Sequence, residues 1–233
     1  MEKLVYALWG VHEGLVEKAG PELLALDPHG LTVNVVDPDV DMSAVVATPA
    51  GDRVGATVGF WLDSLDDRGP YEAVLGGAAD KVAGYLVTES VPLAYDRRTW
   101  PDGERSPGVK QITMFDKRSD IDDAQFFARW HGSHTPLTFE VHPVCLYVRH
   151  AVARAVTDGA PHWRGIVEEG LREVEDLTDP MRYFSAGDSP DALDHNVKRV
   201  MDDVSTFLDL GSVESYPTAE FILRSGGGLM EPS

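Results

Sequence analysis

Short apolar runs alternate with amphipathic stretches throughout the first half of the chain. The apolar runs are rich in β-branched and aromatic residues, which is typical of strands largely buried in a sheet. The longer stretches carry apolar residues at helical spacing, and Gly20–Pro21 is predicted to kink or restart the first of them. The predicted order is β-α-β-β-α-β, with strands over residues 4–9, 31–36, 54–62 and 91–95 and helices over residues 13–26 and 76–89.

The same order of elements begins again after a polar stretch rich in proline and glycine, which is typical of a linker. Strands are predicted over residues 109–115, 144–152, 166–174 and 216–223, and helices over residues 122–141 and 191–208. The pattern therefore predicts a first half over residues 1–98, a linker over 99–108, a second half over 109–225 and a flexible tail over 226–233.

The repeated element order also predicts how the two halves pack. A four-stranded sheet with both helices on one side leaves its other face uncovered, and that face must pack on something. Two such sheets in one chain can cover each other face to face. We therefore expect an α+β protein in which two tandem units form a pseudo-dimer, with a cavity between sheet and helices.

Composition and charge narrow the classes of partner. The formal net charge of −19 disfavours nucleic acid, since phosphate contacts need clustered cations. The acidic surplus is spread along the chain and is typical of a solvated surface. The start of the chain lacks a signal-peptide pattern, and no segment has the apolar length of a membrane helix, so we expect a cytoplasmic protein without a membrane partner.

The candidate chemistry lies between Phe126 and Pro143, where three histidines fall within twelve residues. On a helix, Phe126, Trp130, His134 and Leu137 share one face, so His134 projects from an apolar surface. An imidazole there can act as a general acid or base near neutral pH. The alternative is a buried histidine whose ring nitrogens bond the backbone or a tyrosine. For His131 and His142, surface or capping roles are the corresponding alternative.

His131 and His134 also form a His-x-x-His pair that could bind a divalent ion, with Glu140 or His142 as a third ligand. Pro136 is predicted to kink the last helical turn and to disturb this geometry. No second ligand cluster such as Cys-x-x-Cys is present, because Cys145 is the only cysteine. We therefore expect no metal and no other cofactor.

Residues 109–224 resemble a known family. The segments that carry the resemblance are Lys110–Arg118, Phe126–Leu137 with its His134-x-Pro136-Leu137 motif, and Tyr147–Val152. Together they resemble the EthD-type branch of the dimeric α/β-barrel superfamily. The first half matches in element order only and lacks a His-x-Pro-Leu helix. The resemblance implies two tandem ferredoxin-like units that form an intramolecular dimeric α/β barrel, with the family-like site in the second unit alone.

The resemblance further implies cofactor-free chemistry on a small hydrophobic compound, often aromatic or polyketide-like. Our first hypothesis is a lyase of the decarboxylase, dehydratase or cyclase type. The alternatives are a cofactor-free monooxygenase and a non-catalytic small-molecule binding protein, and pairing into a homodimer stays open. The implied catalytic residues are His134 as acid/base with His131 and Tyr147, and the expected substrate-binding residues are Trp130, His142, His150, Trp9, Trp61, Trp163 and Tyr183. The alternative for Trp9, Trp61, Trp163 and Tyr183 is plain core, which aromatic strand residues more often form.

Overall fold

The computed structural model describes residues 1–45 and 52–226. The first half contains β1 (Glu2–Val11), the π-helical turn η1 (Leu15–Ala19), α1 (Gly20–Ala25), β2 (Gly30–Val36), β3 (Val54–Leu62), the 3-10 turn η2 (Leu65–Arg68), α2 (Gly69–Ala78) and β4 (Ala79–Leu93). The second half contains β5 (Val109–Phe115), α3 (Asp123–Arg129), the π-helical turn η3 (Trp130–His134), α4 (Thr135–Val141), β6 (Val144–Ala155), β7 (Gly165–Leu171), α5 (Glu175–Thr178), α6 (Pro180–Tyr183), α7 (Pro190–Val204), the 3-10 turn η4 (Leu210–Ser212) and β8 (Glu214–Arg224). Apart from Gly226, the predicted tail lies outside the described residues.

The predicted helix over residues 76–89 is wrong. Helix α2 begins at Gly69–Pro70, where proline suits the first turn, and it ends at Ala78. Residues 79–93 then form the long strand β4, so the predicted edge strand over residues 91–95 is its last part. The small, Ala-rich residues of this segment have the spacing of a helical face. Pairing with β1 and β6 nevertheless makes residues 79–93 a strand. Pro92 lies at a register shift between β4 and β6, where no ladder donor is needed.

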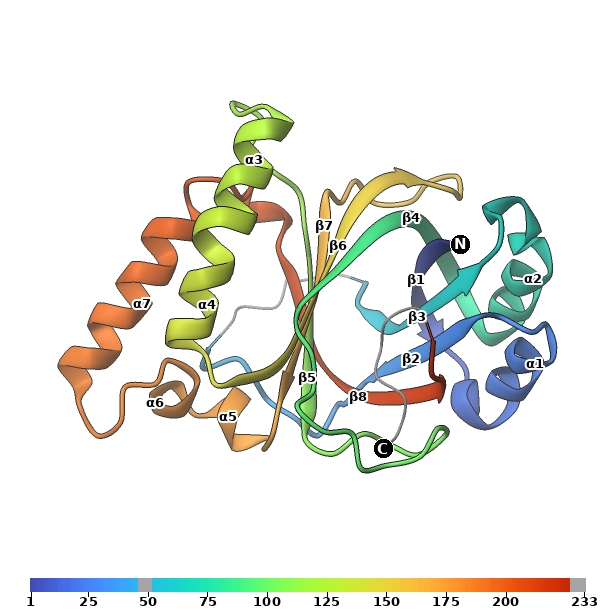
Figure 1. Ribbon diagram of the computed structural model, residues 1–233, viewed down its shortest axis with the longest axis horizontal. Helices are drawn as coiled ribbons and strands as arrows, with labels where there is room; N and C mark the ends of the chain where they lie inside the picture. The colour runs from blue at the N-terminus through green and yellow to red at the C-terminus, as the bar shows by residue number, and fades with distance from the viewer. Residues whose placement is uncertain (46–51, 227–233) are drawn as a thin grey trace.

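The eight strands close into one antiparallel barrel in the order β1-β3-β2-β8-β5-β7-β6-β4. Each half contributes four neighbouring strands, as the predicted β-α-β-β-α-β order requires, and the fold is α+β with two tandem ferredoxin-like units. The halves join edge to edge, because β2 pairs with β8 and β4 pairs with β6. The two sheets curve into a single closed wall, which confirms the intramolecular barrel that the family resemblance implied. Figure 1 shows this barrel between two groups of helices.

Two kinds of side chain fill the barrel interior. One part is apolar and includes Trp9, Tyr85 and Trp163, with ring centroids of Trp9 and Trp163 6.1 Å apart. Toward the start of β1, the interior instead holds a charged network of buried side chains from both halves. Its members are Lys3, Glu89, Lys110, His150, Glu168 and Glu220.

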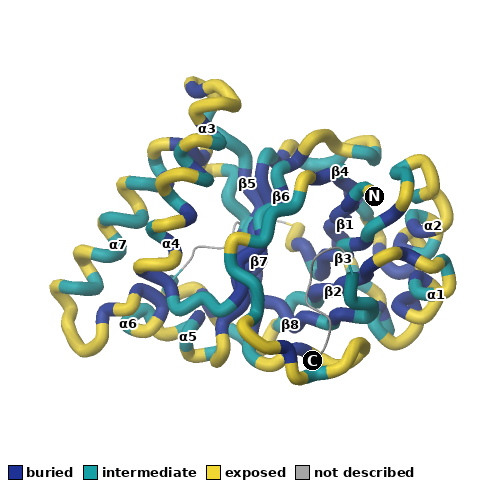
Figure 2. Tube along the Cα trace, in the orientation of Figure 1, coloured by how far each residue is buried: buried dark blue, intermediate teal, exposed yellow. Residues whose placement is uncertain are grey.

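The helices cover the outer faces of the two half-sheets, and most of their own outward residues are exposed (Figures 1 and 2). In the first half, α1 and α2 pack directly on the strands. Tyr6, Phe60 and Tyr71 stack there, with centroid separations of 5.3 and 4.7 Å, so aromatic rings fill the space under the helices. In the second half, α4 and α7 cover the sheet. Within the described ranges, none of the helices has the length and apolar character to cross a membrane.

Candidate active site

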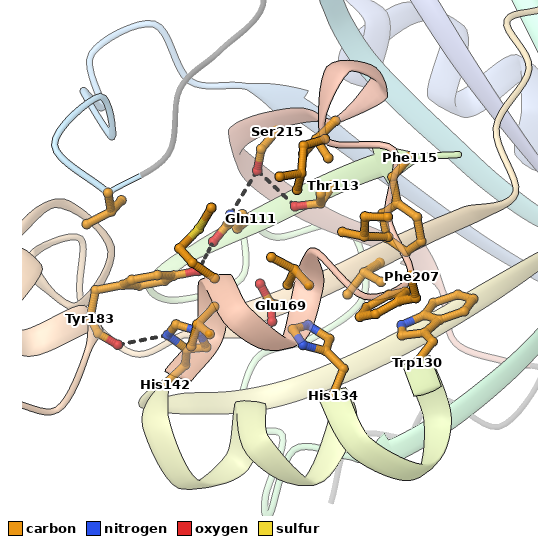
Figure 3. Close-up of a pocket in the computed structure, with 18 of the residues that line it drawn as sticks. Gln111, Thr113, Phe115, Trp130, His134, His142, Glu169, Tyr183, Phe207 and Ser215 are labelled. Atoms are coloured by element: carbon orange, nitrogen blue, oxygen red, sulfur yellow. Dashed lines mark hydrogen bonds between the residues drawn. The ribbon is translucent and has the colours of Figure 1, made fainter. Parts of the chain in front are cut away.

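A cavity of about 320 Å³ lies between the outer face of the second half-sheet and the helices that cover it. We call it the site cavity; its volume suits a small organic ligand. Figure 3 shows the sheet on one side and α4 and α7 on the other. The first half contributes Val45, from the segment after β2. The lining residues are Val45, Gln111, Thr113, Phe115, Trp130, His134, His142, Tyr147, Val167, Glu169, Tyr183, Phe184, Val200, Met201, Val204, Phe207, Leu208, Leu210, Val213 and Ser215.

The helix wall of the cavity begins with a well-defined helix start. Asp122 and Gln125 form a capping box, each side chain bonding the other's backbone N–H, which fixes the first turn of α3. The chain then continues through η3 into α4, with Pro136 in the first turn of α4. The wide π-helical turn lies directly before this proline, and in it the Thr135 N–H bonds the carbonyl of Trp130, five residues earlier. This wall presents Trp130 and His134 to the cavity.

His134 is held by α7. Its Nδ1–H lies 2.8 Å from Oδ2 of Asp203, and the Ser133 hydroxyl donates to the other carboxylate oxygen at 2.5 Å. Burial raises the pKa of Asp203, but the hydrogen bonds from His134 and Ser133 outweigh it, so that pKa lies below its usual value. The ring of His134 packs against Phe207 at 5.3 Å between centroids. An Nδ1 proton shared with Asp203 leaves Nε2 as the unprotonated nitrogen of a neutral ring.

The sheet wall carries a row of polar side chains that bond one another. The Gln111 amide donates to Ser215 Oγ at 2.8 Å, and the Thr113 and Ser215 hydroxyls are also 2.8 Å apart. The Tyr183 hydroxyl from α6 donates to Gln111 Oε1 at 3.1 Å. These groups satisfy much of their own hydrogen-bonding capacity and give the cavity one polar side.

Glu169 differs from these neighbours. It is 8% exposed, lies directly between Tyr147 and Gln111 in the strand register, and lines the cavity. Among the described residues no hydrogen bond or ion pair to its carboxyl is found. Burial raises the pKa of Glu169 to about 7. A carboxyl with this environment can hold or release a proton near neutral pH.

His142 and Tyr147 complete the titratable lining. His142 Nδ1 donates to the Tyr183 carbonyl at 2.9 Å, and burial lowers the pKa of His142 to about 4. Burial and the nearby charge of Glu169 raise the pKa of Tyr147, so this hydroxyl stays protonated. Both are therefore neutral groups on the cavity wall at neutral pH.

The structure brings together five of the ten sequence-predicted site residues on the cavity wall. These are Trp130, His134, His142, Tyr147 and Tyr183. His131 lies beside the cavity, with its ring against Phe127 and Trp130, and burial, followed by the charge of Arg149, lowers its pKa to about 4.

The other four predicted residues lie on the opposite face of the sheet, in the barrel. Trp9 and Trp163 belong to the apolar interior. Trp61 lies near the charged network, with Lys3 Nζ 5.5 Å from its ring centroid. His150 is fully buried in that network, and its Nε2 is 2.8 Å from Glu168. None of these four lines the site cavity as described.

Sequence reasoning missed five polar residues of the site: Gln111, Thr113, Glu169, Asp203 and Ser215. One signal was present in β7, where Glu168 and Glu169 interrupt an apolar strand. Buried carboxylates need a partner or a function, so two of them in such a strand indicate one on each face. Asp203 gave no comparable signal, because its partner lies on a different helix.

The metal hypothesis has no support in the geometry. Among residues 1–45 and 52–226, no group of three or more His, Cys, Asp or Glu side chains is arranged to hold a metal ion. Glu140, the suggested third ligand, pairs with Arg199 on α7 at 2.6 Å. His134 instead uses Nδ1 to bond Asp203.

Comparisons with known proteins identify the fold. No known family matches the chain, and no curated protein matches it in sequence. An anthrone oxidase-like protein matches in structure with a TM-score of 0.59 at 14% identity, covering 98% of this chain and 97% of the other.

Two further structures are candidate monooxygenases. The Lactobacillus acidophilus protein has a TM-score of 0.52 at 9% identity, covering 99% of both chains. The Fusobacterium nucleatum protein has a TM-score of 0.54 at 11% identity, covering 100% of this chain and 97% of the other. At these identities the likeness shows the shared fold, which is the dimeric α/β barrel, formed here within one chain.

Proposed function

We propose that the chain is a cofactor-independent monooxygenase that acts on a small, largely apolar aromatic compound bound in the site cavity. The observation that carries this proposal is the His134–Asp203 pair on the wall of an apolar cavity. A base held in this way, next to aromatic side chains, suits the removal of a proton from a carbon acid. The size of the cavity suits a compound of a few fused rings.

The reaction begins with the transfer of a substrate C–H proton to Nε2 of His134. Asp203 keeps the ring in the required tautomer and stabilises the imidazolium that forms. The electron pair left on the substrate spreads into its ring system and carbonyl, and this carbanion reduces molecular oxygen. For an anthrone, the methylene becomes a carbonyl: one oxygen atom enters the product, the other leaves as water, and the substrate supplies all the electrons.

One observation favours oxygenation over the lyase reactions that the sequence suggested first. The structural relatives include an anthrone oxidase-like protein and candidate monooxygenases, and none of those named above is a lyase. Proton removal is shared by both reaction classes, so the same geometry serves either one. Membership of the EthD-type branch, suggested by the His134-x-Pro136-Leu137 motif, is part of this proposal.

The proposed function is tested by incubating the purified protein with anthrone and dissolved oxygen. The purified chain should consume oxygen and form anthraquinone, and replacing His134 with Ala should lower kcat by about 100-fold or more, because the base is lost. An oxygen electrode and product chromatography measure both results.

Anaerobic controls separate the alternatives. A lyase would convert its substrate without oxygen, whereas the proposed enzyme would stop. Anthrone binding without turnover, unchanged by His134→Ala, would favour a binding protein and contradict the proposal.

A further inference from the structure

We infer that Glu169 is a second catalytic group of the proposed site: its protonated carboxyl donates a hydrogen bond to the substrate oxygen while His134 removes the C–H proton. This inference rests on the proposed function and adds an acid to its base. Figure 3 shows the two groups on different walls, Glu169 on the sheet side and His134 on the helix side. A ligand between them would contact both.

The neighbouring residue on β7 shows why Glu169 is unusual. Strand geometry turns Glu168 to the other face, into the barrel, where Lys110 Nζ and His150 Nε2 lie 2.6 and 2.8 Å from its carboxylate. Burial works against ionisation of Glu168, but these partners, Lys110 first, hold its pKa well below the usual value. Glu169 has the same side chain and a similar burial without any such partner. Packing alone gives no reason for a carboxyl at this position.

The surroundings of Glu169 favour its protonated form. None of the residues described as lining the site cavity is Lys or Arg. The titratable groups that share the cavity are His134 and His142 on the helix side, Tyr147 on β6 and Tyr183 on α6. An ionised carboxylate without a cation or donor is costly in an apolar wall, so burial favours the neutral acid. Its hydroxyl proton then has no acceptor among the described residues and is available to a ligand.

A proton held in this way has a direct use in the proposed reaction. When the C–H bond breaks, negative charge develops on the substrate carbonyl oxygen. A donor already positioned there stabilises this charge, and stabilisation is strong where water is excluded. The proton stays on Glu169 and no electrons are exchanged with it, so the residue is unchanged after each turnover. The polar row of Gln111, Thr113 and Ser215 is mainly occupied with its own hydrogen bonds.

Two substitutions at this position separate a donor from a base. With anthrone as the probe, Glu169→Leu should lower kcat about 100-fold, because the donor is lost. Glu169→Gln keeps an N–H donor, so its kcat should be at least about tenfold higher than that of Glu169→Leu. Activity of the wild type should fall as the pH rises through about 7, and this fall should be absent in Glu169→Gln. Equal inactivity of both variants, with a wild-type rate that rises over the same range, would make Glu169 a base and overturn the inference.

Infrared difference spectroscopy on the ligand-free protein tests the protonation state independently of turnover. A protonated-carboxyl band that titrates near pH 7 should be present in the wild type and absent in Glu169→Gln. Glu140→Gln, a change of the exposed glutamate on α4, is the matched control and should keep the band. A wild type without the band at acidic pH overturns the inference.

The two proposals can fail separately. Absence of oxygen consumption with anthrone by the wild type contradicts the proposed function alone. Anthrone binding then decides the role of Glu169: affinity should weaken with rising pH through about 7 in the wild type and stay constant in Glu169→Gln. Equal pH dependence in both proteins would contradict the donor role.

Discussion

His142 shows how burial of one side chain links the site to the stability of the protein. Its ring lies tilted against that of Tyr183 with centroids 4.2 Å apart, and burial lowers its pKa from 6.5 to about 4. Between these values the unfolded chain binds the extra proton and the folded chain does not. Acid therefore favours unfolding in this window, and the contribution of a neutral His142 is complete above pH 6.5.

Replacing His142 with Gln should reduce the acid sensitivity of the fold. Between pH 7 and pH 4, protonation of His142 should lower the unfolding free energy of the wild type by up to about 3 kcal/mol. The variant lacks this contribution, so its total loss over the same range should be smaller by about that amount. Urea titrations of both proteins at the two pH values measure the difference. Parallel losses in the two proteins would show that His142 is protonated in the folded state.

At the residue scale, the sequence predicted which kinds of side chain form the site better than it predicted the face of the sheet on which each side chain lies. The helical spacing placed His134 and Trp130 correctly on one face of a helix, because only one face of that helix is covered. All seven residues of β7 are buried, so no polar alternation distinguishes its two faces. Trp9 on β1 was expected near a cavity for the same reason, because a barrel strand under helices is buried on both sides.

The segment η3–α4 and helix α7 form the outer wall of the site, and polar contacts tie this segment to α7. Asp203 bonds His134 and Ser133, and Arg199 pairs with Glu140. Asp203 touches no reacting atom and acts through His134, so it is a positioning residue. The adjacent Asp202 points outward and pairs with Lys198 at the surface.

Replacing Asp203 with Asn should lower kcat for anthrone by about 10- to 100-fold with little change in KM, because the base loses its orientation and its charge partner. Asp202→Asn is the matched control, with the same change one residue earlier, and should behave like the wild type. Steady-state kinetics of the two variants give the result. Similar rates in both would show that Asp203 does not position His134.

At the element scale, the position of the long histidine-bearing helix could be predicted from the sequence. The π-helical turn inside it could not. The start of the helix at Asp122 and its end near Val141 were predicted from periodicity, and the structure adds a capping box at Asp122. The sequence indicated that Pro136 would disturb the helix, and the structure locates the adjustment one turn earlier, in η3. The misassigned segment 76–89 shows the limit of periodicity. Pairing on both sides of β4 outweighs its local helix propensity.

The charged network inside the barrel joins the halves of the whole molecule. Lys3 and Glu89 come from the first half, and Lys110, His150, Glu168 and Glu220 from the second. Glu89 and His150 bridge the β4–β6 junction, with Oε2 and Nδ1 3.8 Å apart. Burial opposes the charge of Lys110, yet the charges of Glu168 and Glu220 raise its pKa above the usual value.

Removing the central cation should destabilise the entire barrel. Lys110→Met leaves the carboxylates of Glu168 and Glu220 buried without the lysine that they share, and we expect a loss of about 3–5 kcal/mol of unfolding free energy. Lys198→Met removes an exposed lysine from a surface pair and should change stability by less than about 1 kcal/mol. Urea unfolding at neutral pH compares the two. Near-equal stabilities would mean that the network contributes little to closure.

At the scale of the whole molecule, the repeated element order predicted two units and their α+β class. Closure of the barrel was implied by the family resemblance and not by the hydrophobic pattern, because it depends on sheet twist and on pairing between strands such as β2 and β8, far apart in the chain. The charged side chains of β5, β7 and β8 likewise read as surface residues until the barrel encloses them.

The stack of Tyr6, Phe60 and Tyr71 makes the two units of the duplicated architecture unequal. Those rings occupy, in one unit, the space that the other leaves hollow between strands and helices. The site cavity therefore belongs to the second unit, even though the backbone repeats itself. Substitutions beneath α1 and α2 should act on folding alone, whereas those beneath α4 and α7 should act on what the protein recognises.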